Sequence, residues 1–287
     1  MPTQITNTAS LTFEYGSEKG CATSNTAATT LQETLSISKS SLGCTYSPGN
    51  DIFYIITISN NNSAAVMSVK ISDDLGTYCL GAVSISPLTY AGPAELYIDG
   101  AFQCELEPKI YKNKIVFTVD EIPCHSNAMI IYKAVPNCAA PLELDSVIEN
   151  TASLTSKCLA ETIKASNVVK IANKAEVKIV KSMAPNPVLA GEKLTYTFFL
   201  YNYGNTEATN VVLTDKFGPA PLTVCVAVNG AEVPFKDYTY INDTLTMPAF
   251  GSRMALTIPA AKFKQDPLTG VVTTEPGCAT ITVTGRI

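Results

Sequence analysis

The sequence predicts an all-β protein made of two tandem β-sandwiches with an N-terminal strand or hairpin extension. Stretches of strand length, such as residues 51–60 and 193–202, carry β-branched and aromatic residues. Turn sequences such as SPGND, YIDG and VNGA separate the apolar runs every several residues. No window shows the long apolar stripe of an amphipathic helix, and many short strands at this spacing are typical of sandwiches.

The composition limits the classes of function. The chain has 287 residues, enough for two domains of ordinary size. With 46% apolar and 16% charged residues, a net charge of -5 and no Lys/Arg-rich run, we expect neither disorder nor a nucleic-acid partner. A single histidine, His125, excludes a multi-histidine metal site within one chain, and we expect no metal and no cofactor. The apolar runs are too short for a membrane span, and the N-terminus lacks the basic and apolar regions of a secretory signal.

Two sandwiches are expected because the sequence repeats itself. Leu35–Ser41 (LSISKSS) matches Val177–Met183 (VKIVKSM), and the match continues without a gap to Gly76 and Gly218, at a constant offset of 142. The repeat therefore predicts a first sandwich over residues 35–173. A second sandwich is expected over residues 174–287.

The first 34 residues belong to the same repeat. ITNTASLT (Ile5–Thr12) is nearly identical to IENTASLT (Ile148–Thr155), which should form the closing strand of the first sandwich. Residues 1–34 therefore look like the closing segment of a domain whose body is missing from the chain. The second sandwich should close with residues 270–287, where Gly277–Ala279 stands in the place expected for Asn-Thr-Ala.

The stretch from Val177 to Gly218 carries a Lys-Ser strand, a Gly-Glu turn, a Tyr-x-Phe strand, the pattern N-x-G-x-x-x-A and the pattern V-x-L-x-D. This pattern resembles a bacterial and archaeal surface-repeat family, domain of unknown function eleven, and the two-repeat arrangement resembles a clostridial type. The first half matches as well, with Asn61 and Asn62 in place of the turn around Gly204. The resemblance implies immunoglobulin-like sandwiches in surface, adhesin or envelope proteins, and it does not imply an enzyme.

Some surface sandwiches join a lysine of the first strand to an asparagine of the last strand, with a nearby buried acid assisting. The matching residues of the first sandwich are Lys39, Asp73 and Asn150. This chemistry needs a neutral lysine, which apolar burial favours, and a protonated acid that polarises the amide. The alternative interpretation is an exposed edge lysine, a strand-end aspartate and a turn asparagine.

In the second sandwich Lys181 and Asp215 match, but the asparagine is missing, so Asn7 of a neighbouring subunit is a candidate to replace it. The N-terminal strand would then dock by β-strand addition, and this head-to-tail contact would generate an open filament or array. Alternatively, residues 1–34 form a hairpin on their own first sandwich or stay flexible. The apolar positions that would contribute contact area to the docked strand are Ile5, Leu11 and Phe13.

Nine cysteines are present and none forms a C-x-x-C pair, so zinc-knuckle and thioredoxin-type sites are unsupported. Two interpretations stay open: buried or inert thiols, or a disulfide framework in an oxidising environment. Cys21 lies in the N-terminal segment and has a counterpart region around Cys158. We expect Cys21 to supply the thiol of an intersubunit disulfide, with Cys278 as its candidate partner.

These observations predict a structural, self-assembling subunit of an extracellular filament, an appendage, or a spore or cell surface layer, with further copies of itself as partner. The alternative is a monomeric adhesin or ligand-binding surface module, which should show a concentrated aromatic patch or a metal loop. An enzyme would need an acid pair that no motif favours. Without a secretory signal, assembly around a spore inside a mother cell is one route, whereas a trimmed signal fits an ordinary cell-surface protein.

Overall fold

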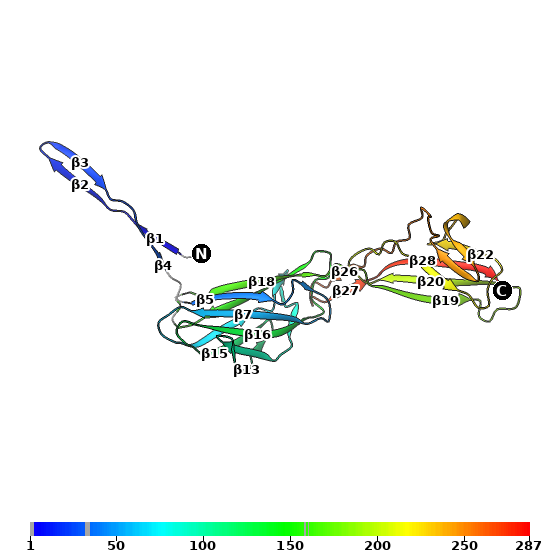
Figure 1. The fold of residues 1–287 in the computed structure, drawn as a ribbon, viewed down its shortest axis with the longest axis horizontal. Coiled ribbons are helices and arrows are strands. Elements are labelled where there is room, and N and C mark those ends of the chain that lie inside the picture. Colours follow the sequence, from blue (N-terminus) through cyan, green and yellow to red (C-terminus); the bar gives the residue numbers. More distant parts are fainter. Residues whose placement is uncertain (1–2, 32–34, 158, 160) are drawn as a thin grey trace.

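The computed structural model describes residues 3–31, 35–157, 159 and 161–287, and it is all-β apart from one short 3-10 helix, η1 (Phe235–Asp237). An N-terminal arm and two sandwiches follow one another along the long axis of the molecule (Figure 1). We call residues 35–173 sandwich 1 and residues 174–287 sandwich 2. In the part of the chain that the structure describes, no helix is long and apolar enough to cross a membrane.

Sandwich 1 consists of two sheets whose strands alternate between buried and exposed side chains, as strands with one face on a core do. In strand β7 (Ile52–Asn60), the side chains of Tyr54, Ile56 and Ile58 are fully buried. The first sheet has the order β13 (Ala101–Leu106), β12 (Ala94–Ile98), β16 (Ser126–Pro136), β7 (Ile52–Asn60) and β5 (Leu35–Ser41), with β11 (Leu88–Tyr90) beside β16. The second sheet has the order β14 (Lys109–Tyr111), β15 (Lys114–Ile122), β8 (Val66–Asp73), β17 (Val147–Thr155), β18 (Ile163–Ile171) and β6 (Thr45–Tyr46), and a small hairpin joins β9 (Tyr78–Leu80) to β10 (Val83–Ile85).

Sandwich 2 repeats this plan with fewer strands. Its larger sheet has the order β19 (Val177–Ala184), β20 (Lys193–Asn202), β28 (Gly277–Arg286), β22 (Val224–Val228) and β23 (Ala231–Glu232). Its smaller sheet contains only β21 (Leu213–Lys216), β25 (Thr244–Met247) and β24 (Thr239–Ile241), and a separate hairpin joins β26 (Lys262–Gln265) to β27 (Val272–Glu275).

Each sandwich encloses a hydrophobic core of its own. The buried apolar side chains of the first core lie between Leu35 and Ile171, and those of the second lie between Leu194 and Val283. Burial of apolar surface is the main stabilising contribution in such layered domains. The predicted all-β architecture of two sandwiches is confirmed. The predicted boundary at 173/174 falls between these two sets of core residues, and the one at 34/35 comes directly before the first set.

A buried asparagine occupies the same place in both sandwiches and shows how they correspond. The side-chain amide of Asn60 donates to the carbonyl oxygen of Pro123 at 2.8 Å, and that of Asn202 donates to the carbonyl oxygen of Pro259 at 3.1 Å. Both asparagines are almost completely buried, so these bonds satisfy donors that would otherwise be costly to bury. Pro123 and Pro259 are therefore equivalent, although they lie beyond the part of the sequence where the repeat is visible.

This correspondence corrects the prediction for the C-terminal segment. Gly277 of β28 stands opposite Asn202, as Ser126 of β16 stands opposite Asn60, so β28 is the counterpart of β16 and not of β17. The prediction that residues 277–279 occupy the place of the Asn-Thr-Ala strand is wrong. Glycine is required here because a Cβ at position 277 would lie 1.9 Å from the carbonyl oxygen of Pro259. Among the described residues, sandwich 2 has no counterpart of the β17–β18 hairpin.

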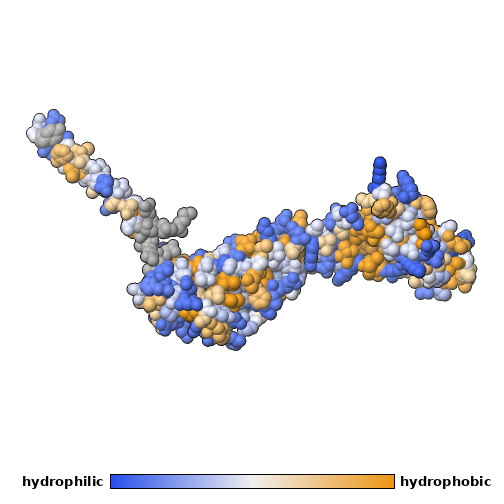
Figure 2. Space-filling model, in the orientation of Figure 1, coloured by the Kyte–Doolittle hydropathy of each residue, from blue (hydrophilic) through white to orange (hydrophobic). Residues whose placement is uncertain are grey.

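The N-terminal arm is a long two-stranded ribbon that stands clear of both sandwiches (Figures 1 and 2). Its base pairs β1 (Thr3–Asn7) with β4 (Ala27–Leu31), and its tip pairs β2 (Ser10–Tyr15) with β3 (Glu18–Thr23). An isolated two-stranded ribbon is marginally stable in water. The arm does not lie on sandwich 1, so the alternative in which it folds onto its own domain is wrong for its described residues.

Candidate functional site

The three residues predicted for a cross-link in sandwich 1 belong to one buried hydrogen-bond network. The ammonium of Lys39, on β5, donates to Oδ2 of Asp73 at the end of β8 at 2.5 Å, and both side chains are inaccessible to solvent. The hydroxyl of Tyr132, on β16, donates to the same oxygen at 2.6 Å. The amide of Asn150, on β17, donates to the Tyr132 hydroxyl at 2.9 Å. The alternative of an exposed lysine and a turn asparagine is therefore wrong for sandwich 1.

The surroundings of Lys39 favour its uncharged form. Burial lowers the pKa of Lys39, against the opposing charge of Asp73 and its hydrogen bond. The ring of Tyr54 packs against the amine, with its centroid 4.9 Å from Nζ. The side-chain carbonyl oxygen of Asn150, Oδ1, is buried without a hydrogen-bond partner. A buried amine whose pKa is lowered thus shares a closed network with an amide whose side-chain carbonyl oxygen has no hydrogen-bond partner.

Tyr132 is the member of this network that the sequence did not reveal. It stands directly opposite Tyr54 across the β7–β16 pair, so its place depends on strand register. Burial raises the pKa of the Tyr132 hydroxyl well above its ordinary value, which keeps it neutral and able to donate to Asp73. No local pattern in the sequence distinguishes this tyrosine from the other strand tyrosines.

Sandwich 2 contains half of the same network. Lys181 of β19 donates to Oδ2 of Asp215 on β21 at 2.6 Å, but the two side chains remain 36% and 18% exposed. The aromatic rings of Tyr196 and Phe217 lie 5.0 and 5.3 Å from the lysine Nζ. Val283 stands opposite Tyr196, where Tyr132 stands opposite Tyr54 in sandwich 1. No described residue of this sandwich supplies the asparagine.

The missing residue is part of a larger gap at the sheet edge. In sandwich 1, β8 pairs with β15 on one side and with β17 on the other, whereas β21 pairs within the described chain only with β25. In sandwich 1, β18 also lies beside β5, and some residues of β5 are buried. In sandwich 2, β19 is the counterpart of β5, and all of its residues are exposed. The apolar side chains left half-exposed on β19 are Val177, Ile179, Val180 and Met183.

The N-terminal arm carries the sequence that this edge lacks. In β17, the inward-facing residues Ile148, Asn150, Ala152 and Leu154 are 0–2% exposed. Their counterparts in the arm include Ile5, which is 50% exposed, and Leu11, which is 56% exposed. Asn7 is likewise exposed, and Phe13, further along β2, is 47% exposed. An exposed apolar strand and an open sheet edge are both liabilities unless they meet a partner.

The arm cannot fill the gap in its own chain. The three residues between β4 and β5 allow a reach of at most about 14 Å, and β5 starts at the end of sandwich 1 that is remote from sandwich 2. Sandwich 1 is at least as long as β16, whose 11 residues span about 37 Å. The equivalent edge of sandwich 1 is already occupied by β17. Another copy of the chain offers the arm a free edge of this kind along β21.

The cysteines are distributed over the surface. The eight described ones are all free and exposed, so the interpretation of buried thiols is wrong for them, and Cys158 lies outside the described residues. Cys278 is on the outer face of β28, next to the buried Ala279. Cys21 is on β3 opposite Thr12. Within the described chain the structure brings no two of these thiols together as a disulfide, and the Cys21–Cys278 pairing stays a prediction.

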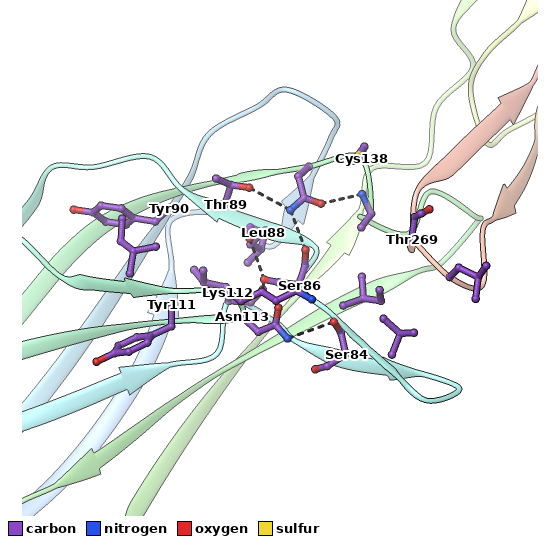
Figure 3. A pocket seen from close by; sticks show the side chains of 17 residues that line it. Ser84, Ser86, Leu88, Thr89, Tyr90, Tyr111, Lys112, Asn113, Cys138 and Thr269 are labelled. Atoms are coloured by element: carbon purple, nitrogen blue, oxygen red, sulfur yellow. Dashed lines mark hydrogen bonds between the residues drawn. The ribbon is translucent and has the colours of Figure 1, made fainter.

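One hollow lies where the two sandwiches meet (Figure 3). It has a volume of about 650 Å³ and is lined by loops of sandwich 1 and by Thr269, near the tip of the β26–β27 hairpin. Its asparagines already donate to protein groups: Asn137 to the carbonyl of Ser86, and Asn113 to the carbonyl of Ser84. In the described part of the chain, no three His, Cys, Asp or Glu side chains form a metal-binding group.

No protein-family model matches the sequence, and a comparison with curated proteins gives no match. Among solved structures, BcpA, the major pilin subunit of Bacillus cereus, is 14% identical with a TM-score of 0.38, over 96% of this chain and 73% of that one. The major pilin GBS80 fragment of Streptococcus agalactiae is 11% identical with a TM-score of 0.37, over 86% of this chain and 80% of that one. A family 123 glycoside hydrolase from Clostridium perfringens is 11% identical with a TM-score of 0.32, over 50% of this chain and 28% of that one. Likenesses at this level do not separate structural proteins from enzymes, and the resemblance to the surface-repeat family stays a prediction.

Proposed function

We propose that the protein is a structural subunit that polymerises head to tail into a filament, an appendage or a layer at the surface of a cell or spore. The arm of one copy completes sandwich 2 of the next by donating its strands to the open edge of β21. The observation that carries the proposal is that the described residues of sandwich 2 include no closing hairpin, whereas a copy of its sequence stands exposed near the N-terminus.

Sandwich 1 supplies the register of this docking. There Ala152 pairs with Asp73, and Leu154 pairs with Ile71. The repeat places Ala9 opposite Asp215 and Leu11 opposite Leu213 in the same way. Asn7 then takes the place of Asn150, beside the half-built pair of Lys181 and Asp215.

The joint between copies is expected to be collinear. In sandwich 1 the open end of the β17–β18 hairpin points toward sandwich 2, and five residues lead from Ile171 to Val177. In the arm, five residues also lead from Thr29, the counterpart of Ile171, to Leu35. In the polymer, sandwich 2 of the acceptor is therefore followed by sandwich 1 of the donor. Their spacing is the same as that between sandwich 1 and sandwich 2 within one chain. A heterologous contact of this geometry gives an open polymer and not a closed dimer.

Docking stabilises the polymer through apolar burial and a continuous strand ladder. Complete burial of a side chain such as Ile5 or Leu11 contributes about 1.5–3 kcal/mol relative to full exposure; because these residues are about half-exposed in the free arm, each contributes a fraction of that. The half-exposed apolar residues of β19 are covered at the same time. Backbone pairing along β21 fixes the register, because a slip by one residue would turn every inward side chain outward.

A covalent bond within sandwich 1 follows from the same network. Neutral Lys39 Nζ attacks Cγ of Asn150, the bond from Cγ to the amide nitrogen breaks, and ammonia leaves, so that an amide links the two side chains. Asp73, which accepts hydrogen bonds from Lys39 and Tyr132, carries the proton between the two nitrogens. In the assembled polymer, Asn7 and Lys181 are placed for the same exchange, with Asp215 as the acid. The intact mass of the protein measures each bond as the loss of one ammonia.

Electron microscopy of the full-length protein, compared with a chain lacking residues 1–31, tests the assembly. The full chain is expected to form fibres or sheets, and the truncated chain is expected to remain a folded monomer because it has nothing to donate. Circular dichroism verifies that the truncated chain is folded. Assembly without residues 1–31 would overturn the strand donation, and a strictly monomeric full chain would favour a ligand-binding surface module.

A further inference from the structure

The β26–β27 hairpin belongs to sandwich 2 but packs against sandwich 1 (Figure 1). The backbone N–H of Val272 donates to the carbonyl oxygen of Cys138 at 2.7 Å. The side-chain amide of Gln265 donates to the hydroxyl of Tyr78. Gly270 lies so close to Ile85 that a Cβ there would approach its Cδ1 to 2.6 Å. The hairpin thus bridges the junction with hydrogen bonds and close packing, beside the hollow of Figure 3.

This hairpin is an insertion that only one of the two sandwiches possesses. It occupies residues 260–276, between Pro259 and Gly277. Between the equivalent Pro123 and Ser126, sandwich 1 has only Cys124 and His125. The difference is fixed by the buried asparagines, whose amides bond to the two equivalent prolines.

A second difference concerns the linker between the sandwiches. The N–H of Glu176 donates to Oδ1 of Asn202 at 2.9 Å, and the N–H of Tyr203 returns a bond to the Glu176 carbonyl at 2.8 Å. Gly204 permits this, since a Cβ there would lie 2.1 Å from the carbonyl oxygen of Lys174. Sandwich 1 has Asn62 in the position of Gly204, so a linker arriving at its end cannot lie equally close.

We propose that the polymer has two kinds of joint in alternation: a braced joint inside each chain and a bending joint between chains. The inference rests on the proposed head-to-tail assembly. At the joint between chains, the domain that follows the acceptor is the donor's sandwich 1. That domain offers the short Cys124–His125 turn in place of the β26–β27 brace, and Asn62 in place of Gly204. The two joints have linkers of equal length, so linker length does not distinguish their stiffness. The difference comes from the β26–β27 brace and from the hydrogen bonds of Glu176 with Asn202 and Tyr203.

Cryo-electron microscopy of individual fibres tests the proposal by measuring the angle between successive sandwiches. The β26–β27 hairpin marks which joints lie within a chain. The angular spread at joints between chains is expected to be at least about twofold broader than at joints within chains, since domain motion is the default where the interface is small. Equal spreads at the two kinds of joint would overturn the proposal.

Variants of the brace give the matched comparison. Gly270→Leu places a side chain against Ile85 and Gln265→Ala removes the bond to Tyr78; either should broaden the joints within chains and leave the joints between chains unchanged. Lys264→Ala, an exposed change on the same hairpin, should leave both unchanged. Broadening at both joints, or at neither, would contradict the assignment of the brace.

A measurement on the unassembled full chain separates this proposal from the assembly itself. NMR relaxation should give both sandwiches of the wild-type chain one rotational correlation time, and Gln265→Ala or Gly270→Leu should give them two. Independent tumbling in the wild-type chain would overturn the brace even if fibres form. If the two sandwiches share one correlation time but the chain forms no fibres, the brace is supported and the proposed head-to-tail assembly is wrong.

Discussion

At the scale of single residues, Lys39 is the side chain whose behaviour depends most on its surroundings. An amine on an exposed edge strand would be a charged, solvated group. Here it is sealed beneath β17 with Asp73, and Tyr132 connects the pair to Asn150. Removing one partner of a buried pair typically costs about 3–5 kcal/mol because the other charge is left uncompensated. The Lys39–Asp73 pair is accordingly fully buried in sandwich 1, where the β17–β18 hairpin is present. The Lys181–Asp215 pair of sandwich 2, which has no such hairpin among the described residues, stays partly exposed to solvent.

The first residue-scale prediction concerns the amide in sandwich 1. Unassembled full-length chain should have a mass one ammonia below that of its sequence, because Lys39 and Asn150 react within the folded domain. Lys39→Met and Asn150→Leu should each restore the full mass. Lys181→Met is the matched control and should keep the loss, since its partner comes from another chain. An unmodified mass in folded wild-type protein would exclude the amide and leave an ion-pair network.

The second residue-scale prediction concerns pH. In Asn150→Leu the amine of Lys39 stays free, and burial still holds its pKa below the ordinary 10.5. The unfolded chain then binds the proton more tightly than the folded chain, so the unfolding free energy should rise as pH increases through the lowered pKa toward 10.5. Denaturant titrations at several alkaline pH values measure this slope. Adding Lys39→Met should abolish it, and an unchanged slope in the double variant would assign it to another group.

At the scale of elements, one hairpin explains most of the differences between the two sandwiches. Where β17 and β18 are present, β8 is paired on both sides and β5 has buried positions. Where they are absent, β21 keeps an open edge and β19 is exposed throughout. The arm has the matching alternation, with Ile5 and Leu11 about half-exposed. The proposed docking would cover the open strand edge and these apolar side chains together.

The element-scale prediction uses neighbouring residues that face opposite ways. Leu11→Asp should abolish assembly, because its counterpart Leu154 is fully buried and an aspartate there would be desolvated without a partner. Thr12→Asp should leave assembly intact, because its counterpart Thr155 is exposed. Sedimentation velocity measures the polymer fraction of each variant. Equal effects of the two changes would mean that the arm does not dock in the register of β17.

At the scale of the whole molecule, the two sandwiches follow one another in line, with the arm at one end and the open edge of β21 on the other sandwich (Figure 1). The arm leaves the end of sandwich 1 that is remote from sandwich 2, and the open edge lies on the far domain (Figure 1). In the proposed assembly the arm and the open edge meet between copies, and growth along one direction is expected. The exposed cysteines lie along the molecule, where disulfides between copies can form once an oxidant is present.

The whole-molecule prediction is that growth can be capped. A synthetic peptide of residues 1–34, added in excess, should occupy the open edge of sandwich 2 and shorten the fibres in a saturable manner, because a capped subunit has no acceptor. Fibre length is measured by electron microscopy. The same peptide with Leu11→Asp is the control and should not shorten them. Fibres of unchanged length with the unmodified peptide would contradict the open edge as the growth site.

The sequence by itself determined the β class and the two-sandwich plan, because alternating strand patterns and a gapless repeat carry this information locally. The candidate pairs Lys39 with Asp73 and Lys181 with Asp215 came from the resemblance to other surface sandwiches. The sequence also identified the N-terminal segment as a displaced copy of residues 148–155. Only the tertiary structure decided that β28 corresponds to β16, that Tyr132 joins the network, and that β26–β27 braces the junction. These features depend on strand register and on backbone contacts between segments far apart in the chain. Gly277 illustrates the reason: its place beside Pro259 follows from a close approach of two backbones, which no local pattern of residue types records.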